Sequence, residues 1–201
     1  MFSLIWRIKD IIAKLKRFVN YWPFFFPVIL LVVKYFITGM PGSGKSSVVH
    51  ELKRRGYTAY DTDDVDGVTR LEDKVSGKPI PWPDGPADFE HHAWRWQGEK
   101  LKQLLASDEL VYIGASVANQ GDYYNLFDGL IALIIDGDTM EQRLALRTNN
   151  SFGNHPQERA DMHKIHERSN QQLTDAGAFL IDAAQPLEKV VEDILNHTNA
   201  S

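Results

Sequence analysis

The chain has 201 residues, of which 43% are hydrophobic and 24% charged, and it contains no cysteine. This length suits one well-buried domain, and the lack of cysteine excludes disulfides, cysteine nucleophiles and thiolate metal sites. Residues 1–34 hold six basic residues and one acidic residue, which gives them a net charge of +5. The total net charge is −5, so the rest of the chain has a net charge of −10. We expect a cytoplasmic protein that does not bind nucleic acid, because such binding requires a basic surface.

Residues 1–33 form an N-terminal segment that differs from the rest of the chain. Up to Val19 its apolar residues recur at helical spacing with basic residues mostly between them, which is typical of a cationic helix on an anionic membrane. The uncharged stretch from Tyr21 to Val33 is shorter than the roughly 20 residues of a spanning helix. Two interpretations stay open. The segment is a peripheral membrane anchor, or the start is mis-assigned and the working protein begins at Val32 or Val33.

From residue 34 onward, short apolar runs alternate with segments of helical periodicity. This alternation predicts a mostly parallel sheet with helices on both faces, a three-layer α/β/α arrangement. The expected strands are 34–38, 57–60, 110–114, 130–135 and 178–181. The expected helices are 45–55, 88–106, 139–147, 157–176 and 186–196.

The sequence GMPGSGKS, from Gly39 to Ser46, matches the phosphate-binding pattern G-x-x-x-x-G-K-[ST]. The glycines let successive N–H groups turn inward, the lysine reaches the outer phosphates, and the serine hydroxyl suits Mg²⁺. The loop stands between an expected strand and an expected helix, whose N-terminus attracts phosphate. The sequence therefore predicts that ATP binds here with Mg²⁺. The residues expected to bind it are Gly39, Gly42, Ser43, Gly44, Lys45, Ser46 and Ser47.

An acidic stretch, DTDD, follows the second expected strand. It places Asp61, Asp63 and Asp64 at the carboxyl end of that strand, the edge at which open α/β sheets bind ligands. The alternative is an Asp-rich helix cap before Val65.

The phosphate loop followed by DTDD resembles the small-molecule kinases of the P-loop fold, the group of shikimate kinase, gluconate kinase and the nucleoside and nucleotide kinases. The resemblance covers roughly residues 34–196. It implies a P-loop NTPase fold for a domain at 34–201, with a five-stranded parallel sheet in the order 2-3-1-4-5 and a mobile lid. It also implies that Asp61 holds Mg²⁺ together with Ser46, and that Asp63 contacts or activates the acceptor hydroxyl.

The segment 138–158 resembles the lid of that group. Arg143 and Arg147 lie four residues apart on an expected helix face, from which planar guanidinium groups reach one phosphate chain. The alternative is a solvated helix face. We expect both arginines to bind the nucleotide, and Lys45, Asp63 and Arg147 to be the catalytic residues.

The acceptor site is expected between the second and third strands. The expected helix 88–106 contains an aromatic and basic cluster, namely His91, His92, Trp94, Arg95 and Trp96. Two tryptophans with an arginine suit a nucleobase and a phosphate, whereas the alternative is that the tryptophans pack in the core and the histidines face solvent. Asn119 and Gln120 follow the third strand and are candidates to face the acceptor, and His163 and His166 are expected at the surface.

Two departures from shikimate kinase bear on the substrate. Gly114 stands alone where that enzyme has a glycine run, and no carboxylate ends the third strand, which leaves Mg²⁺ to Ser46 and Asp61. The sequence predicts an ATP-dependent small-molecule kinase whose acceptor is a nucleoside or nucleotide, before a sugar acid or cyclitol. The alternatives are a nucleotide hydrolase and a membrane-associated nucleotide-binding switch without kinase activity.

Overall fold

A computed structural model of the chain describes residues 32–106, 110–147, 152–153 and 155–198. Residues 1–31 lie outside the described residues, so both interpretations of the N-terminal segment stay predictions. Within the described ranges, none of the helices combines the length and the apolar character needed to cross a bilayer.

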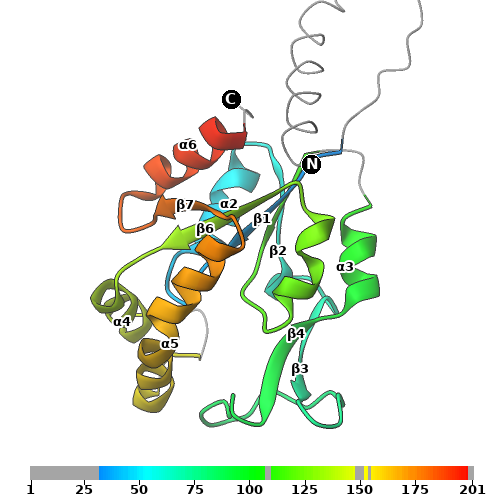
Figure 1. The fold of residues 1–201 in the computed structure, drawn as a ribbon, viewed down its shortest axis with the longest axis vertical. Coiled ribbons are helices and arrows are strands. Elements are labelled where there is room, and N and C mark those ends of the chain that lie inside the picture. The colour runs from blue at the N-terminus through cyan, green and yellow to red at the C-terminus, as the bar shows by residue number, and fades with distance from the viewer. Residues whose placement is uncertain (1–31, 107–109, 148–151, 154, 199–201) are drawn as a thin grey trace, which may run out of the picture. The chain divides into compact units, whose positions relative to one another are not determined.

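The centre of the fold is a five-stranded sheet in which every neighbouring pair of strands is parallel (Figure 1). Its strands are β1 (Lys34–Thr38), β2 (Thr58–Asp61), β5 (Val111–Gly114), β6 (Gly129–Ile134) and β7 (Phe179–Asp182). They are ordered β2-β5-β1-β6-β7. Counted over these five strands alone, this is the predicted order 2-3-1-4-5, so the fold prediction is confirmed.

Helices cover both faces of the sheet and so complete three layers. The helices are α2 (Lys45–Arg54), α3 (Gly98–Leu104), α4 (Gly137–Ala145), α5 (Pro156–Asp175) and α6 (Leu187–Thr198). Two 3₁₀ helices, η2 (Thr62–Asp64) and η3 (Gln120–Leu126), follow β2 and β5. α2 and α6 pack on one face, and α3 with η3 packs on the other.

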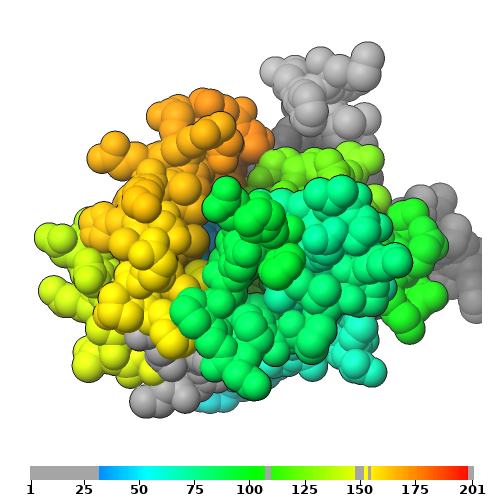
Figure 2. All heavy atoms as spheres, turned by 90° about the horizontal axis from the view of Figure 1, so that it is seen from below, coloured from blue at the N-terminus to red at the C-terminus, as the bar shows by residue number. Residues whose placement is uncertain are grey.

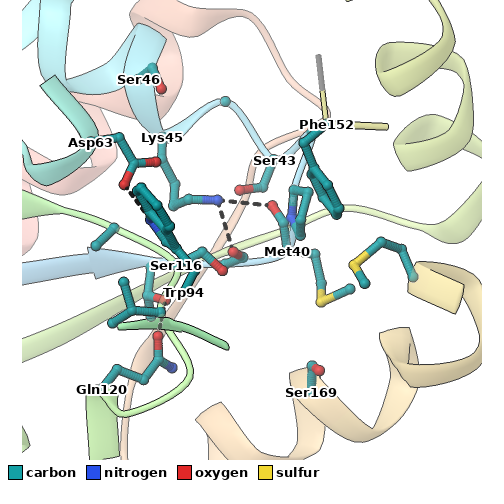
Figure 3. A pocket seen from close by; sticks show the side chains of 18 of the residues that line it. Met40, Ser43, Lys45, Ser46, Asp63, Trp94, Ser116, Gln120, Phe152 and Ser169 are labelled. Carbon is teal, nitrogen blue, oxygen red and sulfur yellow. Dashed lines mark hydrogen bonds between the residues drawn. The ribbon is translucent and has the colours of Figure 1, made fainter. Parts of the chain in front are cut away.

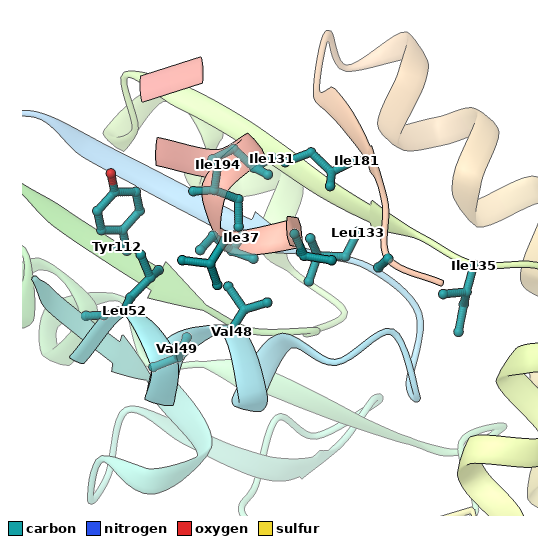
Figure 4. Close-up of a cluster of buried hydrophobic side chains, with 14 of the residues drawn as sticks. Ile37, Val48, Val49, Leu52, Tyr112, Ile131, Leu133, Ile135, Ile181 and Ile194 are labelled. Atoms are coloured by element: carbon teal, nitrogen blue, oxygen red, sulfur yellow. The ribbon is translucent and has the colours of Figure 1, made fainter. Parts of the chain in front are cut away.

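The two faces of the sheet bury two separate hydrophobic clusters, because successive strand residues point to opposite faces. Ile37 and Tyr112 pack with α2 and α6 (Figure 4). Their chain neighbours Phe36 and Ile113 pack instead with α3 and η3. All four side chains are fully buried. The sheet is thereby fixed between its helices, and the loops at its carboxyl edge start from a rigid base.

One element differs from the sequence prediction. Residues 88–96 are not helical. They end in β4 (His92–Trp96), which pairs antiparallel with β3 (Thr69–Asp73) in a separate two-stranded sheet. Aromatic residues favour strands, and the strand that pairs with β4 lies about twenty residues earlier in the chain. The periodicity within 88–106 does not contain this pairing, so it wrongly predicted a helix. Only Gly98–Leu104 of this range forms the expected helix.

We expect Leu52→Ala to lower the free energy of unfolding by about 2–5 kcal/mol, because it leaves a cavity beneath α2. Leu52 is fully buried in the cluster between the sheet, α2 and α6. The matched control is Leu146→Ala, since Leu146 is 82% exposed and its truncation should change stability by no more than about 0.5 kcal/mol. Urea unfolding of both variants is the measurement, and equal losses would contradict the described core.

Candidate active site

A cavity of about 1310 Å³ opens at the carboxyl edge of the parallel sheet. Figure 2 shows the surface hollowed between α5 and the residues around β4. Parallel strands end at the same edge, so the segments that follow β1, β2, β5 and β7 all reach this cavity. Its lining includes every residue that the sequence predicts to bind ATP or Mg²⁺ or to act in catalysis. These are Gly39, Gly42, Ser43, Gly44, Lys45, Ser46, Ser47, Asp61, Asp63, Arg143 and Arg147.

The loop after β1 takes its shape from glycine. Gly39, Gly42 and Gly44 have φ angles of 149°, 84° and 93°, a region that side chains with a Cβ rarely adopt. A Cβ on Gly39 would also lie 2.5 Å from the carbonyl oxygen of Leu133 on β6. The loop therefore passes close to the neighbouring strand before it turns into α2. Gly44 is the N-cap residue of α2 and offers no side-chain cap, which leaves the first N–H groups of that helix available to a ligand.

The loop holds a buried hydroxyl that has no protein partner. Ser43 is 1% exposed, and its Oγ atom makes no hydrogen bond within the described part of the chain. Such a group costs free energy unless it finds a partner, and it often marks the place of a ligand. An oxygen-rich anion in the loop would supply that partner, so the residues present fit a phosphate group.

Lys45 lies inside the loop. Its Nζ atom donates hydrogen bonds to the carbonyl oxygens of Gly39 and Met40, at 2.9 and 3.1 Å (Figure 3). Burial lowers the pKa of Lys45 to about 8, against the opposing effect of the carboxylates of Asp63 and Asp61. The ammonium is thus held among carbonyl dipoles without a direct anionic partner, a position in which a phosphate would stabilise its charge.

The DTDD stretch serves both as a cap and as part of the site. Asp61 is the N-cap residue of η2, and its Oδ1 atom accepts the backbone N–H of Asp63 at 3.1 Å. Asp63 points into the cavity, where the indole Nε1 of Trp94 donates to its Oδ1 at 2.8 Å (Figure 3). Burial raises the pKa of Asp63, and the Trp94 hydrogen bond acts in the opposite direction. The cap interpretation and the site interpretation are therefore compatible.

The two arginines reach the cavity in different ways. Arg143 projects from α4 and donates to the carbonyl oxygens of Gly42, at 3.4 Å, and Ala183, at 2.9 Å. Arg147 lies beyond the end of α4 at Ala145, so the expectation of one shared helix face is wrong. Burial lowers the pKa of Arg147, while Asp63 and Asp61 act to raise it. The helix ends two residues earlier than the periodicity indicates, and Arg147 lies close enough to Asp61 and Asp63 for both carboxylates to act on its pKa.

Four aromatic residues line part of the cavity, and we define them as the aromatic wall: Trp82, Phe89, Trp94 and Phe152. The rings meet edge to face. Centroids are 5.8 Å apart between Trp82 and Trp94, 6.4 Å between Trp82 and Phe89, and 5.3 Å between Phe89 and Phe152. Three members were missed in the sequence, because Trp82 and Phe89 lie in the loop before β4 and Phe152 lies in the lid segment. The only local signal was the unusual run of aromatic residues in a Pro-rich loop.

Only some residues of the predicted aromatic and basic cluster line the cavity. Trp94 and His92 line the cavity, as expected of acceptor residues. Trp96 is instead a core residue, 2% exposed, whose Nε1 donates to the Thr62 hydroxyl at 3.0 Å. Arg95 lies 4.0 Å from Glu72 and does not line the cavity. The alternative that the tryptophans pack in the core is thus right for Trp96 and not for Trp94.

The remaining polar candidates also differ in whether they lie where the sequence predicts. Gln120 lines the cavity and accepts a hydrogen bond from the Thr38 hydroxyl at 3.1 Å. Asn119 does not line it, because its side-chain amide pairs with the backbone N–H and C=O of Trp96. His166 is buried and its Nε2 lies 2.7 Å from the carbonyl oxygen of Ile135, so its expected place at the surface is wrong.

Comparison with known proteins places this fold and site in a class. Residues 36–166 match the AAA domain family, and the chain belongs to that family. The sequence has no match among curated proteins.

Solved structures with a similar fold are kinases of small molecules. A deoxyadenosine kinase from M. mycoides with bound dATP is 18% identical, covers 83% of this chain and 100% of its own, and gives a TM-score of 0.51. A gluconokinase from Sinorhizobium meliloti 1021 is 19% identical, covers 82% of this chain and 90% of its own, and gives 0.52. The deoxyadenosine kinase from M. mycoides with the products dCMP and dCDP is 17% identical. It covers 84% of this chain and 100% of its own, and gives a TM-score of 0.50. The predicted resemblance to the P-loop small-molecule kinases and their fold is confirmed.

We expect Gly39→Ala to destabilise the protein more than Gly56→Ala does. Both glycines have positive φ, so a Cβ brings backbone strain of about 1–3 kcal/mol at either position. At Gly56 the Cβ would meet nothing within 4 Å, whereas at Gly39 it would meet backbone at 2.5 Å. Gly39→Ala should therefore cost at least about 1 kcal/mol more, by urea unfolding. Equal costs at the two positions would mean that the loop does not pass as close to β6 as described.

Proposed function

We propose that this chain is an ATP- and Mg²⁺-dependent kinase that phosphorylates a small-molecule acceptor. One observation carries the proposal: a single cavity brings the phosphate loop with Lys45 together with the carboxylate of Asp63 and the aromatic wall. A phosphate-binding half and an acceptor half that meet at a carboxylate are what direct transfer of a phosphoryl group requires.

The donor half is built for a triphosphate. The glycines and Ser43 of the loop enclose phosphate oxygens, and Lys45 offers a cation at their outer end. ATP bound here would supply the phosphoryl group. Arg143 holds the loop from the lid side through the carbonyl oxygen of Gly42. Arg147, directed toward Asp61 and Asp63, is suited to stabilise the negative charge of the group in transfer.

Ser46 and Asp61 are the residues that would hold Mg²⁺, and both line the cavity. Within the described ranges, no group of three His, Asp or Glu side chains could hold a metal ion. This suits Mg²⁺ in a kinase, since the ion takes most of its ligands from phosphates and water and one or two from the protein.

Asp63 is suited to orient the acceptor hydroxyl and to accept its proton. Trp94 holds the Oδ1 atom of this carboxylate at 2.8 Å, which fixes the direction of the other oxygen. Partial desolvation in the cavity raises the pKa of Asp63, which makes its carboxylate a better proton acceptor than a fully hydrated aspartate, provided that it is ionised before the hydroxyl arrives.

The acceptor half favours an uncharged compound with an aromatic ring. Edge-to-face aromatic side chains suit a planar base. Among the described residues that line this half, Lys74 is the basic side chain with a full charge, and its ammonium already donates to the carbonyl oxygens of Phe89 and Glu90. Residues 148–151 and 154 of the lid segment carry no charge in the sequence. Among the described residues this half thus offers four aromatic rings and one fully charged basic side chain, so we infer that the acceptor is a nucleoside rather than a nucleoside monophosphate or a sugar acid. Of the two similar kinases, the deoxyadenosine kinase is the better guide to the substrate.

An acceptor screen tests this function. We expect ADP release from ATP and Mg²⁺ to rise at least about tenfold with one or more of the deoxynucleosides and ribonucleosides, and not with nucleoside monophosphates, gluconate or shikimate. The phosphate-loop variant Lys45→Ala, checked for a native circular dichroism spectrum, should lose this activity. Equal ADP release with and without every acceptor would favour a hydrolase. Tight ATP binding without any turnover would favour a nucleotide-dependent switch.

We expect Asp63→Asn to reduce kcat by about 10²–10⁴, the usual contribution of a positioned proton acceptor. Asparagine keeps the shape of the side chain and can still accept the Trp94 hydrogen bond, so the KM for ATP should change less than about twofold. The matched control is Asp64→Asn, because Asp64 is exposed and does not line the cavity. A similar kcat for both variants would remove Asp63 from the mechanism.

A further inference from the structure

A buried carboxylate joins two loops that lie far apart in the sequence. Glu158 lies in the first turn of α5 and is 4% exposed. Its Oε1 atom accepts the backbone N–H of Ala87 at 2.9 Å, and its Oε2 atom accepts the backbone N–H of Gly153 at 2.7 Å. Ala87 belongs to the loop that leads to β4, and Gly153 belongs to the lid segment before α5. Each carboxylate oxygen is therefore used by a different loop.

Each of these loops carries part of the aromatic wall. Ala87 lies two residues before Phe89, and Gly153 directly follows Phe152. The Phe89 and Phe152 rings meet edge to face with centroids 5.3 Å apart, and both line the cavity. Glu158 itself does not line the cavity. Any effect that it has on the acceptor must therefore pass through the positions of these two rings.

Gly153 is also fixed to the donor half of the site. Arg159 donates from Nη1 to the carbonyl oxygen of Gly153 at 2.8 Å. Gly153 has a φ angle of 90°, and a Cβ there would lie 2.9 Å from Cδ2 of Leu144 on α4. Leu144 in turn lies near Gly42 of the phosphate loop. A Cβ added to Gly42 would be 3.5 Å from the Cγ atom of Leu144. A continuous set of contacts thus runs from the phosphate loop through α4 and Gly153 to Glu158 and Ala87.

We propose that Glu158 is a positioning residue that couples the loop before β4 to residues 152–153 and thereby fixes the Phe89 and Phe152 rings of the aromatic wall. The position of the carboxylate at the N-terminus of α5 favours its charge, and the two backbone N–H groups satisfy its oxygens. If either loop moves away, one buried oxygen loses its partner at a substantial cost in free energy, so each loop stabilises the position of the other. The consequence for acceptor binding rests on the kinase function proposed above, whereas the coupling of the loops does not.

Hydrogen exchange tests the coupling without any ligand. Glu158→Gln keeps the size of the side chain but replaces one acceptor oxygen with an NH₂ group, which cannot accept either N–H. We expect exchange of the amides of Ala87 and of Gly153 both to become at least about tenfold faster. The matched control is Glu167→Gln, because Glu167 lies on the exposed face of the same helix. In this variant the amides of Ala87 and Gly153 should exchange at the same rates as in the unaltered protein. No change at both amides, or a change at Gly153 alone, would overturn the coupling.

Kinetics test the positioning role. With the most active nucleoside from the acceptor screen, Glu158→Gln should raise the acceptor KM about tenfold and change the KM for ATP less than about twofold. An unchanged acceptor KM together with faster exchange would overturn the positioning role. Absence of acceptor-dependent turnover in the unaltered protein would instead count against the kinase function, and the exchange result would still decide the coupling. If Glu158→Gln does not fold, Glu158→Asp takes its place in both measurements. It keeps the charge but is one methylene too short to reach both loops.

Discussion

The close backbone approach between Gly39 and the β6 strand is the constraint on which the site depends. β1 lies between β5 and β6 in the centre of the sheet, so the chain that leaves it at Thr38 has a rigid strand on either side. Only a residue without a Cβ passes the carbonyl oxygen of Leu133 at this point. The turn that follows encloses Ser43 and Lys45 at the N-terminus of α2, and the donor half of the cavity is thereby set by backbone geometry before any polar side chain contributes.

The charged groups of the cavity depend on one another because they lie close together where protein atoms displace part of their hydration. Burial lowers the pKa of Lys45 and of Arg147 and raises the pKa of Asp63, and in each case the opposite charges across the cavity act against the effect of burial. A buried charge without such a partner would be strongly unfavourable. The carboxylates of Asp61 and Asp63 thus favour the charged forms of Lys45 and Arg147, and Lys45 favours the charged form of Asp63. This mutual dependence is typical of sites at which charge is rearranged in a reaction.

The sequence was sufficient for the parts of the fold and site that depend on local pattern. The phosphate loop and the aspartates after β2 are contiguous stretches of sequence, and the alternation of strands and helices predicts the parallel sheet. The strand order followed from the resemblance to the P-loop kinases, and the residues predicted to bind ATP and Mg²⁺ all line one cavity. The β3 and β4 pair could not be predicted in this way, because Trp94 is positioned by a strand about twenty residues away. Likewise nothing local to Phe152 indicates that it meets Phe89, more than sixty residues earlier. The donor half was therefore predictable residue by residue, and the acceptor half was not.

This difference between the halves has a physical basis in what each must recognise. A triphosphate presents the same oxygens to every protein, and backbone N–H groups with one lysine satisfy them, so a short sequence pattern suffices. An acceptor is recognised by shape, which requires rings from separate segments to be held at fixed angles to one another. The chain has no cysteine for a disulfide, and among the described residues no group of three His, Asp or Glu side chains could hold a metal ion at the wall. Its segments are joined within the described part of the chain by ring contacts and by buried polar groups such as Glu158. Acceptor specificity in such a cavity therefore resides as much in the residues that fix the wall as in the residues that touch the substrate.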